Sequence, residues 1–348
     1  MDHAVDLFAE YRRLAAAWQG DAMADRVYLA VDMGASSGRH VAGLFNGQHL
    51  ELAEVYRFDN GPVRAAKHLY WDLLAQWTQL TQGLRAAGAR WPQITSVGVD
   101  TWGVDFGLLD RNDDLVANPI HYRDPRTDGL LERALEIVPR ERIFSQTGLQ
   151  FMQFNTLYQL WAMRLAGSPL LDAAERLLMI PDLFHWLLTG VKANEFTNAT
   201  TTQLFDPRQN AWARELIAAF DIPGRLFGEV VEPGTRLGRL RGQIARETGL
   251  ERVEVVLPGT HDTASAVVAV PAETPPADQP RWCYISSGTW SLMGAEVPRA
   301  IVNDQCLALN FTNEGGVGGT TRLLKNIAGL WLVQECRRIW NKSGKDWS

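Results

Sequence analysis

The chain has 348 residues, which at about 100–200 residues per domain predicts two domains. Hydrophobic residues make up 46% and charged residues 21%, the composition of a soluble globular protein. The formal net charge is −6, from 34 Lys and Arg against 40 Asp and Glu. Because there is no basic excess, we expect neither a nucleic-acid nor an anionic-membrane partner. A single phosphorylated small molecule needs only local donors and is not excluded.

Cysteine usage and hydropathy predict a cytoplasmic protein. Cys283, Cys306 and Cys336 are far apart and form no C-x-x-C pair, which excludes a disulfide framework and disfavours a zinc ribbon. No apolar run approaches the ~18–20 residues that span a bilayer. The acidic start of the chain does not fit a signal peptide. The sequence leaves the oligomeric state open.

The first part of the chain predicts a short helix followed by an antiparallel meander. Residues 4–18 place apolar side chains at helical spacing. Strands are predicted at 27–31, 40–45 and 50–58, and Asn46-Gly47 is typical of a two-residue hairpin turn. A glycine-rich turn therefore joins the first strand directly to the second.

The remaining pattern mixes helices with buried strands. We expect a helix at 73–90, a strand at 94–100, an apolar segment at 104–109 and mostly helices over 127–220. One of those helices starts at Pro181 and ends at Thr189-Gly190. A strand at 253–257 and a helix at 264–270 precede a proline-rich linker. Strands at 283–286 and 291–294 and a helix at 330–340 follow.

The two parts of the chain have unequal lengths. Both open as a strand, a Gly/Ser turn and a second strand, but residues 27–270 number 244 and residues 282–348 only 67. Because two or three strands alone make a marginal sheet, we expect the chain to be truncated relative to a complete two-domain protein. The expected organisation is an extension helix at 1–24, a first domain at 25–270, a linker at 271–280 and the beginning of a second domain at 281–348.

The turn at 32–39 is a candidate anion site. Glycine and serine after a strand offer backbone N–H groups to a phosphate, and Asp32 could hold a hydrated Mg²⁺. A plain hairpin turn favours the same residues. Gly34, Ser36 and Gly38 also match the G-x-S-x-G elbow of esterases, but that elbow needs a helix after the strand, and here a strand follows.

A second candidate lies at Gly259-Thr260-His261-Asp262-Thr263, where a strand ends and a helix begins. Ligands bind at the carboxyl ends of strands in α/β sheets, and an ionised Asp262 could accept a proton from a substrate hydroxyl. The alternative is an ordinary helix N-cap.

Other motifs carry less information. The sequence Ser286-Ser287-Gly288-Thr289 is a further candidate anion loop, Asn326 fits a helix N-cap, and residues 315–319 predict a flexible turn. Walker A, Rossmann and H-E-x-x-H motifs are absent. Trp71, Trp102 and Trp290 lie beside the candidate loops; an aromatic ring suits the apolar side of a sugar, although core packing is the common role.

Together these segments resemble one family, the FGGY carbohydrate kinases, and within it the kinases of L-rhamnulose. The resemblance covers about residues 28–340. It rests on residues 31–39, Gly98-Val99-Asp100-Thr101-Trp102-Gly103-Val104-Asp105-Phe106, residues 122–127, 154–160 and 198–204, His261-Asp262-Thr263-Ala264-Ser265-Ala266-Val267, residues 286–294, and Leu324-Lys325-Asn326-Ile327-Ala328-Gly329-Leu330-Trp331.

The resemblance implies an α/β, actin/hexokinase-like fold with two ribonuclease-H-like lobes, the second incomplete here. It implies ATP-dependent phosphorylation of L-rhamnulose at its 1-hydroxyl, with ATP and Mg²⁺, in L-rhamnose breakdown. Asp262 would be the proton acceptor. Carried over by position, the sugar contacts are Gly103, His261, Asp262, Thr263 and Asn326, and the ATP contacts are Ala35, Ser36, Ser37, Gly38, Arg39, Thr289 and Gln334.

One departure from the family leaves alternatives open. The family continues past residue 340 with a glycine-rich loop that contacts adenosine, and this sequence lacks that loop. The chain could therefore be a non-catalytic sugar-binding fragment. A kinase for a related ketose or deoxy sugar is the other alternative.

Overall fold

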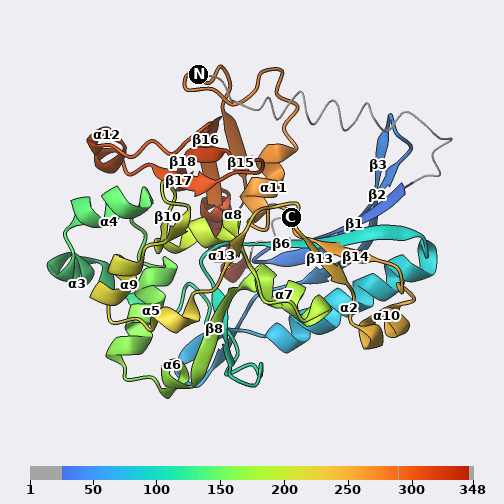
Figure 1. Ribbon diagram of the computed structural model, residues 1–348, viewed down its shortest axis with the longest axis horizontal. Helices are drawn as coiled ribbons and strands as arrows, with labels where there is room; N and C mark the ends of the chain where they lie inside the picture. Colours follow the sequence, from blue (N-terminus) through green and yellow to red (C-terminus); the bar gives the residue numbers. More distant parts are fainter. Residues whose placement is uncertain (1–25, 289, 345–348) are drawn as a thin grey trace. The chain divides into compact units, whose positions relative to one another are not determined.

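The computed structural model describes residues 26–288 and 290–344, which form two compact units (Figure 1). The first unit takes the chain up to Arg126, then Gly167–Asn198 and Arg225–Asp262. The second takes Thr127–Ala166, Ala199–Gly224 and the chain from Thr263 on. The helix predicted at 4–18 and the ATP contact predicted at Thr289 lie outside the described residues.

A six-stranded mixed sheet forms the centre of the first unit. Its order is β13-β14-β6-β1-β2-β3. Strands β1, β2 and β3 form the predicted antiparallel meander, whereas β6 runs parallel to both β1 and β14. The bounds are β1 Arg26–Met33, β2 Ser37–Phe45, β3 Leu50–Asp59, β6 Ile94–Thr101, β13 Arg236–Arg239 and β14 Glu254–Val256. The parallel strands therefore end at the same edge of the sheet.

Alternating apolar side chains explain why the central strands form. In β1, Val27, Leu29, Val31 and Met33 are buried, as the period of two along a strand requires. Helix α2 packs against β2 and β3, and α7 packs against β6 and β14. The helices of this unit are α2 Leu73–Arg90, α6 Pro169–Ala173, α7 Ile180–Thr189 and α10 Gly242–Thr248.

Short strand pairs complete the first unit. They are β4 Pro62–Ala65 with β5 His68–Trp71, β7 Phe106–Asp110 with β8 Ala174–Met179, and β9 Asn194–Glu195 with β12 Val230–Val231. The 3₁₀ turn η3 spans Gly224–Leu226 at the boundary with the second unit. Residues 127–220 are mostly helical, as expected, but strand β8 is an exception: it pairs with β7, nearly seventy residues earlier in the chain.

The hairpin between β2 and β3 differs in detail from its prediction. A two-residue turn at Asn46-Gly47 was expected, but the strands end at Phe45 and resume at Leu50. The Asn46 carboxamide oxygen accepts the backbone N–H groups of Gln48 and His49, at 3.0 and 2.8 Å. This Asx arrangement stabilises a four-residue loop.

A four-stranded antiparallel sheet, in the order β15-β16-β18-β17, lies in the second unit. Its strands are β15 Tyr284–Ser287, β16 Trp290–Val297, β17 Thr312–Gly315 and β18 Thr321–Ala328. Val267, Tyr284 and Leu324 form a small buried cluster. The expected strand, Gly/Ser turn and strand are found at β15 and β16.

The second unit also contains most of the helices predicted over 127–220. They are η1 Pro125–Thr127 at its boundary, α3 Leu130–Ile137, α4 Arg140–Thr147, α5 Thr156–Leu165 and α9 Arg214–Ala219, with η2 Thr200–Thr202 and the pair β10 Phe205–Asp206 and β11 Ala211–Trp212. Helix α8, Phe196–Ala199, and helix α11, Asp262–Val268, cross the boundary between the units. Helices α12 Asp304–Ala308 and α13 Trp331–Lys342 lie near the end of the chain, the second close to its prediction.

Candidate functional site

Hydrogen bonds within the turn and from Asn60 fix the backbone of the glycine-rich turn between β1 and β2. Gly34 N–H donates to the Ser37 carbonyl at 2.9 Å, which closes the turn. Asn60 holds it from outside, because its backbone N–H donates to the Ser36 carbonyl at 3.1 Å and its Nδ2 to the Gly34 carbonyl at 2.7 Å. Within the described residues, the N–H groups of Ala35 and Ser36 donate no hydrogen bond. Two amides are thus available to an anion, as a phosphate-binding turn requires.

Gly38 in this turn has a packing reason to be glycine. A Cβ at Gly38 would lie 2.1 Å from Cζ of Phe58, whose ring occupies that space. The sequence analysis assigned glycine and serine in this turn to offering backbone N–H groups to a phosphate. Contact with Phe58 requires a glycine here whether or not a phosphate binds.

Asp32 and Arg39 face each other across the β1–β2 pair. Arg39 Nε and Nη2 both lie 2.9 Å from Asp32 Oδ2, and both side chains are partly exposed. Mg²⁺ prefers one or two carboxylates with water and phosphate oxygens, so a partly exposed Asp32 beside a candidate anion-binding turn fits such an ion. Among the described residues, no group of three or more His, Cys, Asp or Glu side chains is placed to hold a metal ion.

Asp100 is a buried carboxyl that the sequence interpretation did not select. It lies at the end of β6, directly opposite Asp32 in the parallel register. Burial raises the pKa of Asp100 well above its ordinary value, and the charges of Asp32 and Asp262 raise it further.

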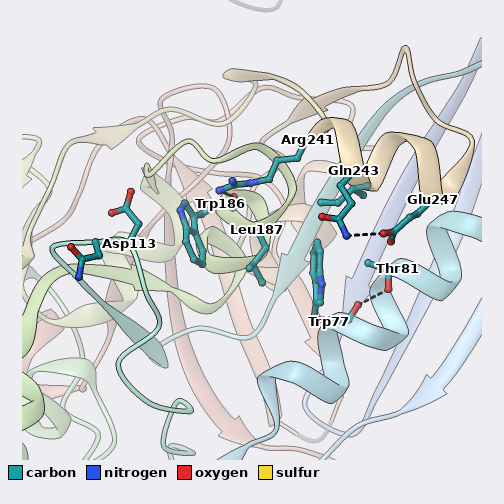
Figure 2. A pocket seen from close by; sticks show the side chains of 10 residues that line it. Trp77, Thr81, Asp113, Trp186, Leu187, Arg241, Gln243 and Glu247 are labelled. Carbon is teal, nitrogen blue, oxygen red and sulfur yellow. Dashed lines mark hydrogen bonds between the residues drawn. The ribbon is translucent and has the colours of Figure 1, made fainter.

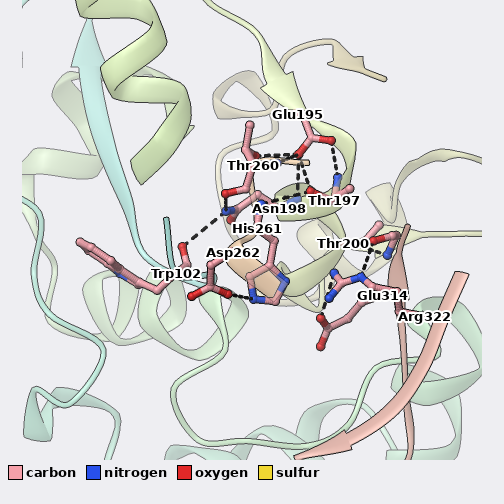
Figure 3. A network of polar contacts seen from close by, with 11 residues as sticks. Trp102, Glu195, Thr197, Asn198, Thr200, Thr260, His261, Asp262, Glu314 and Arg322 are labelled. Carbon is pink, nitrogen blue, oxygen red and sulfur yellow. Dashed lines mark hydrogen bonds and ion pairs between the residues drawn. The ribbon is translucent and has the colours of Figure 1, made fainter. Parts of the chain in front are cut away.

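The turn at 259–262 follows β14 and is fixed to the end of β6. Thr101 N–H donates to the Thr260 carbonyl at 2.9 Å, and Thr101 and His261 form a parallel bridge. His261 Nε2 lies 3.4 Å from Asp262 Oδ1. The His261 side chain is 11% exposed and that of Asp262 is 41% exposed, so the carboxylate is open to a substrate. Figure 3 shows the pair, and above it the buried Glu195 with its contacts to Thr197 and Thr260.

Gly103 occupies a tight turn whose neighbours are held by Asp105. The Asp105 Oδ2 atom is buried and accepts the indole N–H of Trp71 at 2.6 Å and of Trp102 at 3.0 Å. The two indole rings lie 4.0 Å apart between centroids. Trp71 and Trp102 are therefore core residues at the base of the Gly103 turn, in line with the packing alternative.

Three predicted site residues, Asn326, Thr263 and Gln334, belong to the second unit. Asn326 lies in β18, opposite Leu292 of β16, so the helix N-cap expected for it is wrong. Its backbone N–H donates to Gln150 Oε1 at 3.4 Å. Thr263 is buried, and Gln334 is exposed on α13.

The Gly/Ser segment between β15 and β16 makes backbone and side-chain hydrogen bonds. Gly288 N–H donates to the Trp290 carbonyl at 2.8 Å, and the Gly288 carbonyl accepts from Leu330 N–H at 2.9 Å. Ser287 and Ser291 hydroxyls lie 3.5 Å apart. The loop at 315–319 joins β17 to β18 and contains two glycines of positive φ, Gly318 and Gly319, as a turn predicts.

The sequence-predicted residues therefore fall into two sets. The first unit contains Asp32 at the end of β1, residues 35–39 in the turn and at the start of β2, Gly103 after β6, and His261 and Asp262 after β14. The second unit contains Thr263, Asn326 and Gln334. Four residues that hold these turns or lie beside them were not selected from the sequence: Asn60, Asp100, Asp105 and Glu195. Only Asp100 and Asp105 lie within a segment that carries the family resemblance, residues 98–106.

A separate cavity of about 610 Å³ also lies in the first unit (Figure 2). Trp77 of α2, Trp186 of α7 and Gln243 of α10 are among its lining residues. None of the predicted site residues lines it, so it is distinct from the turns described above.

The comparison with protein families decides the assignment. Residues 27–269 match the FGGY family of carbohydrate kinases, N-terminal domain, which is more than half of the chain. The chain belongs to the FGGY family of carbohydrate kinases. Among the described residues of this FGGY chain, no helix has both the length and the apolarity needed to cross a membrane.

Curated relatives of this FGGY chain include several rhamnulokinases. That of Oceanobacillus iheyensis is 44% identical over 313 residues, and that of Halalkalibacterium halodurans 45% identical over 315 residues. Each alignment covers 90% of this chain and 65% of the relative. The rhamnulokinase of Bacillus subtilis is 39% identical over 312 residues. The chain therefore spans less than two thirds of the length of these relatives.

Solved structures confirm the α/β sugar-kinase fold. A ligand-bound xylulose kinase from Lactobacillus acidophilus superposes with a TM-score of 0.78 at 14% identity, covering 90% of this chain and 62% of that one. Plasmodium falciparum glycerol kinase with ADP gives 0.71 at 15% identity, covering 89% and 64%. The esterase alternative is not supported, because β2 rather than a helix follows the G-x-S-x-G sequence.

Proposed function

We propose that this FGGY-family chain carries the ATP-dependent phosphorylation of L-rhamnulose to L-rhamnulose 1-phosphate, in L-rhamnose breakdown in the cytoplasm. The observation that carries the proposal is the 44–45% identity to relatives named rhamnulokinase over 90% of the chain. The exposed carboxylate of Asp262 on an otherwise buried turn supports the chemical assignment.

Asp262 acts as the general base in this proposal. Its carboxylate accepts the proton of the sugar 1-hydroxyl while that oxygen attacks the γ-phosphorus of ATP. A bond forms between the sugar oxygen and phosphorus, the bond from phosphorus to the bridging oxygen of ADP breaks, and the proton remains on Asp262. Gly103, His261, Thr263 and Asn326 are the proposed sugar contacts, and His261 at 3.4 Å orients the carboxylate.

The nucleotide contacts are proposed for the two Gly/Ser turns. Residues 35–39 offer the unpaired N–H groups of Ala35 and Ser36 to phosphate oxygens, and Thr289 and Gln334 are the contacts proposed from the second unit. Asp32 would hold Mg²⁺ through water. When bound with ATP, Mg²⁺ neutralises charge on the transferred group.

Two further functions remain candidates because the chain spans 65% of its first relatives. It could bind the sugar without transferring phosphate. It could also act on a related ketose or deoxy sugar, which a substrate panel decides.

A turnover assay combined with calorimetry tests the proposal. With MgATP and L-rhamnulose, wild type should release ADP, and Asp262→Asn should lower kcat by about 10²–10⁴-fold while sugar binding persists. Asp172→Asn, an exposed aspartate on α6, is the matched control and should keep wild-type turnover. Near-normal turnover of Asp262→Asn would refute the base assignment. Sugar binding without any turnover by wild type would favour the non-catalytic binder.

A further inference from the structure

A single buried carboxylate, Glu195 of β9, accepts five hydrogen bonds. Its Oε1 accepts Thr197 N–H at 2.9 Å. Its Oε2 accepts the Thr197 hydroxyl at 2.6 Å, Asn198 N–H at 3.3 Å, Thr260 N–H at 3.0 Å and the Thr260 hydroxyl at 2.6 Å. The Glu195 side chain has no exposed surface. Figure 3 shows it directed at the backbone of residues 197–198 and 260.

These bonds tie two segments far apart in the chain to each other. Thr197 and Asn198 follow β9, whereas Thr260 immediately precedes His261 and Asp262. A sixth contact joins the same segments, because His261 N–H donates to Thr197 Oγ1 at 3.1 Å. The backbone of the 259–262 turn is therefore held by Glu195 through Thr260 and by Thr197 through His261.

The chemistry of the donors explains why a carboxylate is present. Three of the five partners are backbone N–H groups, which can only donate: that of Thr197 at Oε1, and those of Asn198 and Thr260 at Oε2. Both Glu195 oxygens must therefore accept, as they do in a carboxylate. Burial raises the pKa of Glu195, and the hydrogen bonds from Thr197 and Thr260 oppose that rise. Asp182 supports the strand itself, because its Oδ1 accepts Glu195 N–H at 3.2 Å.

We propose that Glu195 is a positioning residue for Asp262. By accepting hydrogen bonds from Thr260 and Thr197, it fixes the position of the proton-accepting Asp262 carboxylate at the end of the turn. This inference rests on the proposed kinase function of Asp262. A displacement of about 1 Å at a reacting group can cost about 10²-fold in rate, whereas it removes little binding energy. The effect of losing the Glu195 contacts therefore falls on kcat.

The matched pair Thr260→Val and Thr260→Ser tests this role. Valine keeps the shape but removes the hydroxyl that donates to Glu195, whereas serine retains it. We expect Thr260→Val to lower kcat about ten- to a hundred-fold with KM within about twofold, and Thr260→Ser to restore most of kcat. Thr248→Val is the control, because the buried Thr248 hydroxyl donates to the Ile244 carbonyl within α10, outside this network. Glu195→Gln, which replaces one acceptor oxygen by a donor, should resemble Thr260→Val.

A second measurement separates this inference from the proposed function. Histidine ring ¹H–¹⁵N spectra, with His261 assigned through His261→Gln, report the His261–Asp262 pair without any turnover. We expect the His261 signals to move in Thr260→Val and to remain in place in Thr248→Val. If wild type shows no turnover, the kinase proposal fails, and these spectra alone decide whether Glu195 positions the pair. With an active wild type, equal kcat in Thr260→Val and Thr248→Val would overturn the inference, and unmoved His261 signals would overturn it in either case.

Discussion

Asp32 and Asp100 lie opposite each other in the parallel pair of β1 and β6, yet their surroundings differ sharply. Asp32 is partly exposed and paired with Arg39, whereas Asp100 is buried and forms no ion pair within the described residues. The same strand ends therefore present one partly exposed carboxylate, paired with an arginine, and keep a second carboxyl in a low-dielectric position. Burial and the charges of Asp32 and Asp262 make ionisation of Asp100 unfavourable.

Asp100→Asn should stabilise the protein at neutral pH. Because the folded-state pKa of Asp100 is raised, the folded protein binds this proton more tightly than the unfolded chain does. The free energy of unfolding therefore falls as pH rises from about 4 through the folded-state pKa, and asparagine avoids that loss. We expect a gain of about 1 kcal/mol at pH 7.5 that shrinks toward pH 4.5, measured by urea unfolding.

Asp172→Asn is the control for this measurement, since its exposed side chain should change stability by less than about 0.5 kcal/mol at either pH. A gain for Asp100→Asn that is the same at both pH values would contradict the assignment. Such a result would mean that packing, not ionisation, is responsible.

Gly38→Ala should destabilise the first unit by about 1–3 kcal/mol through overpacking. The added Cβ would lie 2.1 Å from Cζ of Phe58. Phe58→Leu in the same chain should recover part of the loss, which a double-mutant cycle of thermal unfolding would measure. Gly61→Ala is the matched control, because a Cβ there meets nothing within 4 Å. Additive effects of Gly38→Ala and Phe58→Leu would show that the ring is not the obstacle.

Local signals predicted the strand, turn and strand that contain residues 32–39, and distant contacts explain what was missed. The residues from Asp32 to Arg39 carry the strand end, the turn and the next strand within one short window, so alternation and glycine content suffice. Asn326 is a polar residue in an apolar run, and only pairing with β16 distinguishes a strand from a helix start. Glu195 has no local signature as an anchor, because Thr260 is sixty-five residues away.

The same contrast holds for the fold. The β1–β2–β3 meander was predicted because each strand follows its partner in the chain. The pairing of β8 with β7 was not, because about seventy residues separate them and the flanking segments are helical. Pattern reasoning is therefore strongest where strand partners are neighbours in sequence.

His185 should make the protein sensitive to mild acid. It is buried on α7, and its Nε2 accepts Val99 N–H at 3.1 Å, an arrangement that requires a neutral ring. Burial lowers the pKa of His185 from 6.5 to about 4. The unfolded chain therefore binds the proton more readily than the folded protein does. The contribution of neutral His185 to the free energy of unfolding is fully present above pH 6.5 and is lost as pH falls toward 4. From pH 7 to pH 5 this single group should lower the free energy of unfolding by about 2 kcal/mol.

His185→Gln separates this effect from other acid-sensitive groups. The glutamine amide oxygen can still accept from Val99 N–H but does not titrate, so the difference between pH 7 and pH 5 should shrink by about 2 kcal/mol relative to wild type. His49→Gln, at an exposed position in the β2–β3 loop, provides the comparison and should leave that difference unchanged. Urea unfolding at the two pH values measures all three proteins. An undiminished pH difference in His185→Gln would mean that protonation of this ring does not drive the acid sensitivity.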